Sequence, residues 1–181
     1  MSGAVVWFTG LPSSGKSTLA GWVAEALEAR GVAHVVLDGD EVRAALVPTP
    51  GYSPLARTQF YLTLARLAAL LAGQGLVVLV AATAHRRAFR AAARRLAPRF
   101  LEVFVDTRPD ECRARNSKGL YGQAARLPGA GVRYEPPLEP DLRAVGGATR
   151  AAVAECLRLL RVGRARRAPS TGARRRPLVE R

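Results

Sequence analysis

The 181-residue sequence is poor in lysine, cysteine and acidic side chains. Only two of its 28 basic residues are lysines, Lys16 and Lys118, and its 14 acidic residues leave a formal net charge of +14. Its two cysteines, Cys112 and Cys156, are too few for a disulfide framework and have no metal-ligand spacing. This cysteine usage favours a reducing compartment, so we expect a cytoplasmic protein.

Long apolar runs are also missing. No uninterrupted run reaches the roughly 18 residues that a membrane-spanning helix needs. The most apolar stretch, residues 62–84, is broken by Arg66 and by the Gly-Gln-Gly sequence at 73–75. No basic segment precedes the first apolar run, so we expect neither a secretory signal nor a membrane partner. With 49% hydrophobic residues, the chain suits a single domain with a sizeable core.

Half of the net positive charge lies near the C-terminus. Residues 161–181 contain eight arginines and one glutamate among alanine, proline, serine and glycine, a composition that cannot bury a core. We therefore expect a folded domain over 1–163 and a basic, disordered tail over 164–181. Because the charge is concentrated in this tail, we do not expect the folded domain to bind nucleic acid. The alternative to a disordered, solvated tail is a tail that binds RNA or phospholipid.

Strand and helix patterns alternate along the rest of the chain. Strands are predicted at 4–10, 33–40, 75–82 and 99–107, and helices at 16–31, 53–75, 86–97, 108–115 and 147–163. Ser53 with Pro54 predicts a helix start, and Gly31 a helix end. This order predicts an α/β fold with a parallel sheet between two helical layers. Segment 118–145, rich in glycine and proline, is expected to be an irregular lid.

Ligands of such sheets bind beyond the carboxyl ends of the strands, which points to residues 10–17, 38–43, 83–87 and 106–108. The first of these, "GLPSSGKS", fits the pattern G-x-x-x-x-G-K-[ST] between a strand and a helix. Backbone N–H groups in this loop cradle phosphates, Lys16 reaches the β- and γ-phosphates, and Ser17 offers a hydroxyl to Mg²⁺. The motif predicts a P-loop NTPase fold with Mg·ATP as co-substrate, bound by Gly10, Leu11, Pro12, Ser13, Ser14, Gly15, Lys16, Ser17 and Thr18.

A second cluster, "LDGDEVR", follows the second predicted strand. Phosphoryl transfer needs a carboxylate to orient and deprotonate the acceptor hydroxyl, and Asp40 is our candidate. Asp38 is placed to hold a metal-bound water, and Arg43 to pair with an anionic acceptor. The alternative interpretation is a turn in which Asp40 is the N-cap of the next helix, and the two interpretations are compatible.

With these two motifs, the chain resembles the adenylylsulfate (APS) kinases, P-loop enzymes that phosphorylate the 3′-hydroxyl of adenosine 5′-phosphosulfate. The resemblance covers about residues 4–145 and continues through "GYS" (51–53), "GLVVLVAA" (75–82), "KGLY" (118–121) and "YEPP" (134–137). It implies that Lys16, Asp40 and Arg43 are catalytic and that the protein is a homodimer. It also implies that Arg115 and Lys118 cover ATP, and that the acceptor is bound by Asp38, Asp40, Arg43, Tyr52, Arg57, Thr83, Lys118 and Leu120. Tyr52 stands where the family usually has the phenylalanine that stacks on the acceptor's adenine.

Several departures from the family pattern lie on the acceptor side. Ala56 replaces an acidic residue, Phe60 an asparagine, Ala84 a serine and Asn116 an aspartate, and the usual second aromatic face is Leu127 or absent. The sequence "TAHRR" adds His85, Arg86 and Arg87, which can bind an anionic acceptor group or simply open a solvated helix. Two alternatives to an APS kinase follow: a relative that uses another nucleotide-linked anionic acceptor, and a non-catalytic protein that binds nucleotide or nucleic acid.

Overall fold

The computed structural model describes residues 3–115, 128, 129 and 131–162, and they form a parallel sheet between helices. The five strands have the order β2-β3-β1-β4-β5, and every pairing is parallel. The elements are β1 (Ala4–Thr9), α1 (Lys16–Glu28), β2 (His34–Asp38), α2 (Gly39–Ala45), α3 (Pro54–Gly73), β3 (Val77–Ala81), α4 (Arg87–Leu96), β4 (Phe100–Asp106), α5 (Pro109–Arg115), β5 (Leu142–Val145) and α6 (Arg150–Leu160).

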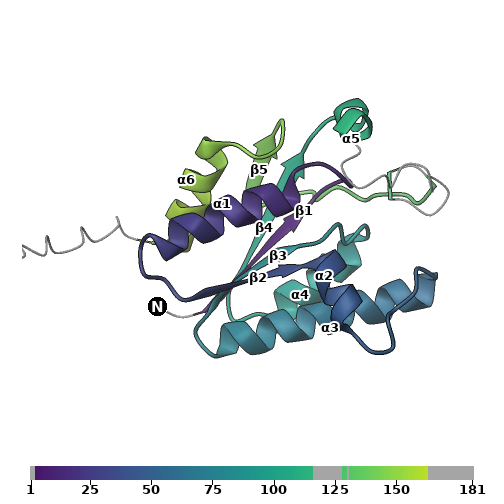
Figure 1. The fold of residues 1–181 in the computed structure, drawn as a ribbon, viewed down its shortest axis with the longest axis horizontal. Coiled ribbons are helices and arrows are strands. Elements are labelled where there is room, and N and C mark those ends of the chain that lie inside the picture. The colour runs from purple at the N-terminus through teal and green to yellow at the C-terminus, as the bar shows by residue number, and fades with distance from the viewer. Residues whose placement is uncertain (1–2, 116–127, 130, 163–181) are drawn as a thin grey trace, which may run out of the picture.

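The two faces of the sheet are covered by different helices (Figure 1). On one face, Val6 and Phe8 of β1 pack with Leu19 and Val23 of α1 and with α6. On the other face, Trp7 of β1 packs with the buried sides of α3 and α4. Successive strand residues point to opposite faces, so β1 and β3 are apolar throughout because both faces are covered. The three expected layers are confirmed.

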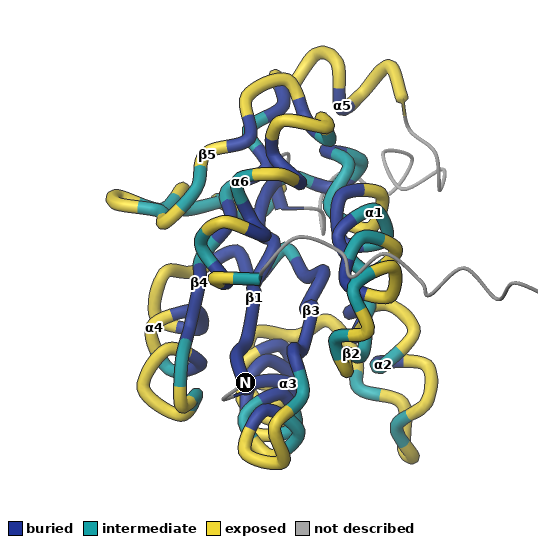
Figure 2. Tube along the Cα trace, turned by 90° about the vertical axis from the view of Figure 1, so that its left-hand side faces the viewer, coloured by how far each residue is buried: buried dark blue, intermediate teal, exposed yellow. Residues whose placement is uncertain are grey.

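Burial is greatest in the middle of the sheet. Every residue of β1 and β3 is buried, whereas the edge strand β2 is mostly half-buried. Figure 2 shows these central strands in dark blue between helices whose outer sides are exposed. The carboxyl ends of the strands lie on the side where α5, the 131–141 segment and the α2–α3 connection gather (Figure 1). No described helix has both the length and the apolar character needed to cross a membrane.

One predicted helix boundary, the start of α3, is confirmed, and two predicted boundaries are wrong. Ser53 is the N-cap of α3, where its hydroxyl accepts the Ala56 N–H at 3.2 Å, and Pro54 is the first helical residue. Gly31 has a left-handed φ of 64° but lies beyond the C-cap, which is Ala29. Asp40, expected at a strand end or as an N-cap, lies in the first turn of α2 instead.

The prediction that 118–145 contains no packed element was wrong at its end. Residues Leu142–Val145 form β5, which pairs in parallel with β4 at the edge of the sheet. The strand has four residues, only one of them buried, so its apolar signal is weak. Residues 116–127 and 130, including Lys118, Leu120 and Leu127, lie outside the described residues.

Candidate active site

The phosphate loop joins β1 to α1 and depends on backbone conformations that glycine adopts easily. Gly10 has φ 155° and Gly15 φ 101°, and a Cβ at Gly10 would approach the Val105 carbonyl oxygen to 2.5 Å. Glycine is therefore required at Gly10 by the close contact with β4 as well as by the turn. The loop ends at Lys16, the first residue of α1, so backbone N–H groups at the helix start face the loop.

The polar side chains of the loop converge on its interior. The Lys16 ammonium donates to the carbonyl oxygens of Leu11 at 2.7 Å and Gly10 at 3.3 Å, which holds it across the loop. The Ser13 and Ser14 hydroxyl oxygens are buried without a hydrogen-bond partner among the described residues. Because such buried hydroxyls are costly, a ligand that brings acceptor oxygens to this loop stabilises it.

Ser17 and Asp38 bring a hydroxyl and a carboxylate together from two different elements. The Ser17 hydroxyl donates to Asp38 Oδ2 at 2.5 Å, and Asp38 Oδ1 accepts the Asp40 N–H at 2.9 Å. Asp38, rather than Asp40, is therefore the N-cap of α2. These oxygens suit Mg²⁺, and the described residues contain no group of three or more potential ligands among His, Cys, Asp and Glu. Hydroxyl and carboxylate oxygens are ligands that Mg²⁺ accepts, so Ser17 and Asp38 are the residues here that could hold it.

Residues that follow β4 and β5 support the loop from behind. The Thr107 hydroxyl donates to the Ser14 carbonyl oxygen at 2.8 Å, and Arg115 Nη1 donates to the same oxygen at 3.5 Å. Gly147 packs closely here: an added Cβ would lie 3.0 Å from Thr107 Oγ1 and 3.1 Å from the Ser14 carbonyl oxygen. Thr107 falls within a segment that the sequence nominated, whereas Gly147 was missed because β5 was missed.

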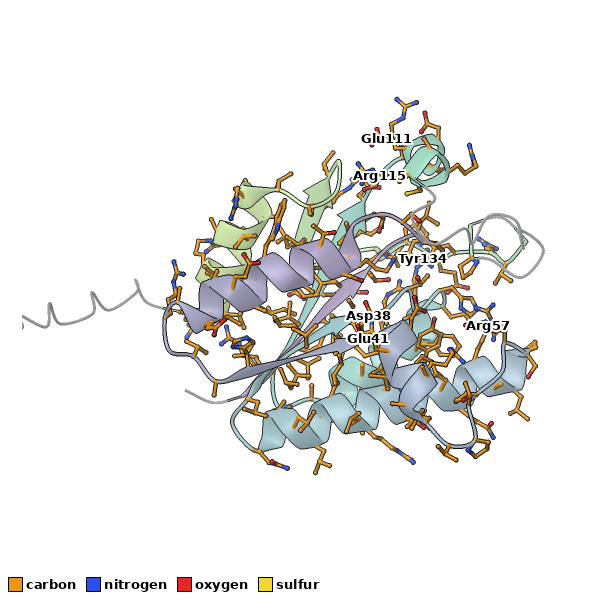
Figure 3. All side chains as sticks on the ribbon, viewed as in Figure 1. Asp38, Glu41, Arg57, Glu111, Arg115 and Tyr134 are labelled. Atoms are coloured by element: carbon orange, nitrogen blue, oxygen red, sulfur yellow. The ribbon has the colours of Figure 1, made fainter. Side chains whose placement is uncertain are left out.

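The candidate residues line one cavity of about 720 Å³. It extends from Arg115 on α5 to Arg57 on α3, two residues that lie on different sides of Asp38 in Figure 3. Of the expected residues, it includes Pro12, Ser13, Gly15, Lys16, Ser17, Thr18, Asp38, Asp40, Arg43, Tyr52, Arg57, Thr83 and Arg115. Gly10, Leu11 and Ser14 do not line it, and contribute the loop backbone described above.

The wall away from the phosphate loop consists of arginines stacked on aromatic rings. The Arg43 guanidinium carbon lies 3.7 Å from the centre of the Phe60 ring and 4.6 Å from that of Tyr52. Arg43 Nη1 also donates to the carbonyl oxygens of Pro50 at 3.0 Å and Gly51 at 2.9 Å. Burial lowers the pKa of Arg43, while the nearby Tyr52, Tyr61 and Asp40 oppose that shift. Arg43 therefore fixes the loop that carries Tyr52, and Phe60 fixes Arg43.

Arg57 and the turn after β3 complete this wall. Arg57 is buried, and its Nε donates to the Tyr52 carbonyl oxygen at 2.9 Å. Ala84 has a left-handed φ of 39° and is fully buried, and His85 is buried against Tyr61 and Phe89. Burial, followed by the charges of Arg57 and Arg86, lowers the pKa of His85 to about 4. The imidazole is therefore neutral at neutral pH.

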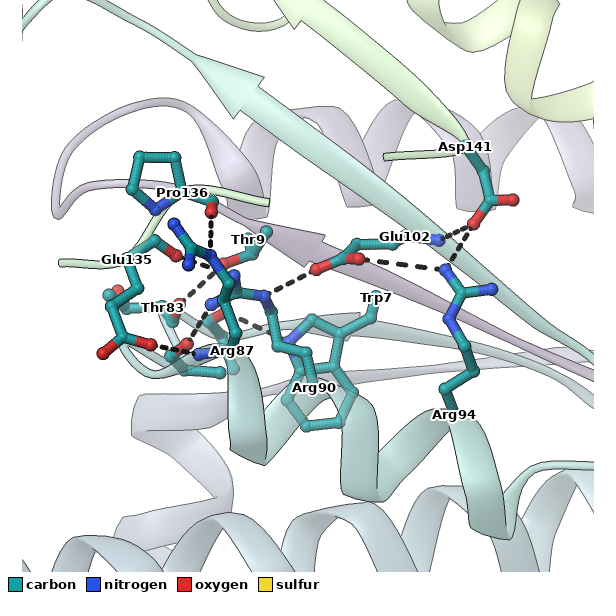
Figure 4. A network of polar contacts seen from close by, with 12 residues as sticks. Trp7, Thr9, Thr83, Arg87, Arg90, Arg94, Glu102, Glu135, Pro136 and Asp141 are labelled. Atoms are coloured by element: carbon teal, nitrogen blue, oxygen red, sulfur yellow. Dashed lines mark hydrogen bonds and ion pairs between the residues drawn. The ribbon is translucent and has the colours of Figure 1, made fainter. Parts of the chain in front are cut away.

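A buried arginine that the sequence did not single out holds the turn after β3 in place (Figure 4). Arg90 donates to Glu102 Oε1 at 2.6 Å, to the Ala84 carbonyl oxygen at 2.5 Å and to the Glu135 carbonyl oxygen at 2.7 Å. It thus joins α4 to β4, to the turn and to the "YEPP" segment. The sequence does contain a signal: Glu102 is a lone acid inside the apolar run "RFLEVFV", where a carboxylate needs a partner.

The same segment reaches the start of the phosphate loop. The Tyr134 hydroxyl lies 3.0 Å from Thr9 Oγ1, and Thr9 donates to the Thr83 carbonyl oxygen at 2.7 Å. Burial raises the pKa of Tyr134 to about 12, so the phenol stays protonated. Arg87, for which the sequence allowed either contact with an anionic acceptor group or a place at a solvated helix start, is the first residue of α4 and donates its Nε to the Pro136 carbonyl oxygen at 2.8 Å.

A parallel sheet, a phosphate loop after the first strand and a carboxylate pair after the second define a P-loop phosphotransferase. A family model described as adenylylsulphate kinase matches residues 2–145, and the chain belongs to this family.

Individual relatives agree with the family assignment. The chain is 41% identical over 166 residues to an adenylyl-sulfate kinase from Vibrio cholerae, covering 87% of this chain and 77% of that protein. It is 43% identical over 169 residues to one from Citrobacter koseri, covering 89% and 84%. The solved Mycobacterium tuberculosis APS kinase in complex with AMPPNP and APS superposes with a TM-score of 0.82 at 36% identity, covering 88% of this chain and 98% of that one.

Proposed function

We propose that this protein transfers the γ-phosphoryl group of ATP to the 3′-hydroxyl of adenosine 5′-phosphosulfate. The observation that carries the proposal is that Lys16 and Ser17 of the phosphate loop share one cavity with Asp40 and Arg43. A donor held by its phosphates and an acceptor held by the arginine wall would meet inside it. The relatives named above support this choice of acceptor.

Each residue has a defined task in this reaction. Asp40 accepts the proton of the acceptor hydroxyl while that oxygen attacks the γ-phosphorus, and the bond to the β-phosphate oxygen breaks to release ADP. Lys16 and the loop N–H groups stabilise negative charge on the transferring group. Arg43 and Arg57 hold the anionic part of the acceptor, and Tyr52 offers an exposed ring on which a base can stack. Arg115 contacts the ATP side.

We also propose that Mg²⁺ is bound at Ser17 and Asp38, where the two oxygens fit it. A bound magnesium ion supplies charge neutralisation at the β- and γ-phosphates. Asp38 reaches the ion directly or through a water molecule. The Ser17–Asp38 hydrogen bond supports this placement, because it shows that the two side chains can approach a common point.

We further propose a cytoplasmic homodimer with a catalytic domain over 1–163 and a basic tail over 164–181. The two cysteines are free and buried, which fits a reducing compartment. Helix α3 exposes Leu55, Leu62 and Leu70, and such an apolar outer side suits a contact between two copies. Sedimentation of the wild type and of Leu62→Glu tests this: we expect a dimer that the variant converts to a monomer, and a wild-type monomer would refute it.

Incubation with Mg·ATP and a panel of acceptors tests the main proposal, with ADP release as the signal. We expect turnover with APS at low micromolar concentration and none in a Lys16→Ala variant. Turnover only with another nucleotide would favour the relative with a different acceptor, which is suggested by Phe60 in place of a polar residue on the Arg43 wall. ADP release that is no faster with an acceptor than without one would refute phosphotransfer to APS. So would the absence of turnover combined with tight RNA binding, if that binding is lost when residues 164–181 are deleted.

A further inference from the structure

A second cavity of about 490 Å³ adjoins the first. Tyr52 and Arg57 line both cavities, so the two share a wall. The remaining described residues around the second cavity are Ser53, Pro54, His85, Arg86, Phe89 and Val132. None of the phosphate-loop residues is among them, so the second cavity meets the first at the wall that carries Tyr52 and Arg57 and not at the phosphate loop.

The lining of the second cavity is positively charged. Arg57 and Arg86 contribute guanidinium groups, and no acidic residue is found among its described lining residues. The acidic residue that faces this region is Glu135, whose carboxylate accepts the Arg87 backbone N–H at 2.9 Å. That hydrogen bond, followed by the charges of Arg87, Arg133 and Arg86, lowers the pKa of Glu135. The single carboxylate of Glu135 therefore does not balance the positive charge of Arg86, Arg87 and Arg133 around it.

His85 gives the cavity a second kind of polar group. Its ring is only 5% exposed and lies edge-on to Phe89, with ring centres 5.3 Å apart. Its Nδ1 is buried without a hydrogen-bond partner among the described residues. The charges of Arg57 and Arg86 disfavour protonation of this ring, so it adds hydrogen-bonding capacity without adding charge.

We propose that the second cavity is a binding site for a tetrahedral oxyanion, a phosphate or sulfate group, held by Arg86 at its rim and by Arg57 at the shared wall. Guanidinium groups bind such anions with paired, charge-assisted hydrogen bonds. The start of α4 is not itself the binding group, because the Arg87 N–H already bonds to Glu135. This inference depends on the proposed function only if the bound oxyanion is part of the acceptor. A free oxyanion satisfies the same chemistry.

Arg86→Gln in the full-length protein tests the site. Arg86 makes no side-chain cap bond to α4, so the helix should be retained, which is checked by circular dichroism. Arg95→Gln is the matched control, because Arg95 is an exposed arginine on the same helix that does not line the cavity. His85→Phe is a second variant, since it keeps an aromatic ring against Phe89 and removes both ring nitrogens.

Two readouts separate the sources of the oxyanion. If it belongs to the acceptor, Arg86→Gln raises the KM for APS roughly 10-fold, with kcat and the KM for ATP within about twofold of wild type. If it is a free anion, APS kinetics are unchanged, but the rise in Tm produced by sodium sulfate over sodium chloride at equal ionic strength is lost in Arg86→Gln. Arg95→Gln behaves as wild type in both assays, and His85→Phe weakens whichever effect is seen.

Unchanged APS kinetics together with an unchanged sulfate-dependent Tm in Arg86→Gln would overturn the proposal. Equal effects of Arg86→Gln and Arg95→Gln would also overturn it, since equal effects would mean that the anion responds to the net positive charge of the protein and not to a specific site. A protein that never turns over APS would refute the proposed function but not this site, because the sulfate-dependent Tm does not require catalysis.

Discussion

The two ends of the main cavity are built in different ways. The end that we propose binds ATP is made largely of backbone: a loop with glycines in left-handed conformations, held against β4 and supported by Thr107. The end that we propose binds the acceptor is made of side chains, with Arg43 between two aromatic rings and Arg57 bonded to the Tyr52 carbonyl oxygen. A backbone cradle tolerates few changes, whereas a wall of side chains can be altered to suit another acceptor. We therefore expect substitutions at the two ends to affect different kinetic constants.

The largest effect is expected at the ATP end. Lys16→Ala should lower kcat at least about 1,000-fold, because it removes the charge that stabilises the transferring phosphoryl group. Lys16→Arg keeps the charge but places a bulkier planar group in the loop, and should also be nearly inactive. ADP release at saturating substrates measures both. More than a tenth of wild-type kcat in Lys16→Arg would contradict the role assigned to the shape of lysine.

The next largest effect concerns stability on the acceptor side. Arg90→Met should lower the free energy of unfolding by about 3–5 kcal/mol, because it removes the donor to two carbonyl groups and leaves the mostly buried Glu102 carboxylate with only the longer Arg94 contact at 3.8 Å. Urea unfolding measures the loss. Adding Glu102→Gln should recover part of it, since the poorly compensated charge is then removed. A loss below about 1 kcal/mol would mean that Arg90 does not hold the turn after β3.

Asp38→Asn separates the role of Asp38 as the N-cap of α2 from its proposed role in binding Mg²⁺. Asparagine caps helices about as well as aspartate, so the free energy of unfolding should change by less than about 0.5 kcal/mol. It lacks the carboxylate charge, so kcat/KM for Mg·ATP should fall about 100-fold and more free Mg²⁺ should be needed. Initial rates across a magnesium series test this. A parallel loss of stability and activity would show that the cap, rather than the metal, is responsible.

His85 provides a test by pH. Its pKa is lowered from 6.5 to about 4 in the folded protein, so the folded state disfavours a protonated ring. The resulting stability is fully present above pH 6.5 and is lost as the pH falls toward 4. Relative to His85→Phe, the wild type should lose about 2–3 kcal/mol of unfolding free energy over that range. Urea unfolding at several pH values measures the difference, and two parallel pH profiles would show that His85 is not held neutral.

The smallest effect is expected from Phe60→Leu. The change removes the ring from Arg43 but retains an apolar side chain of similar size, so the KM for APS should rise roughly 10-fold. The KM for ATP should stay within about twofold, since Phe60 is distant from the phosphate loop in sequence and role. Thr63→Ala, at an exposed position on the same helix, is the control. An equal rise in both KM values would contradict the separation of the two ends.

Most of the phosphate-loop end of the cavity could be predicted from the sequence because its residues are contiguous. Gly10 to Thr18 form one loop and the start of α1, and a short pattern between a strand and a helix identifies them. The acceptor end depends on contacts between distant segments, such as Phe60 on Arg43 and Arg90 on Glu102, which no local spacing reveals. An arginine-rich helix resembles a solvated one, so Arg90 was overlooked. The sequence did not predict β5 because this strand is short, lies at the edge of the sheet and has only one buried residue, so its apolar pattern is weak.

The position of the transferred phosphate is the most direct test of the account. Phosphorus NMR of the product formed from Mg·ATP and APS identifies which hydroxyl has reacted. We predict one new phosphate on the 3′-oxygen for each ADP released, because Asp40 and the phosphate loop face the same cavity. Phosphate on another oxygen of APS, or ADP release that leaves APS unmodified, would contradict it.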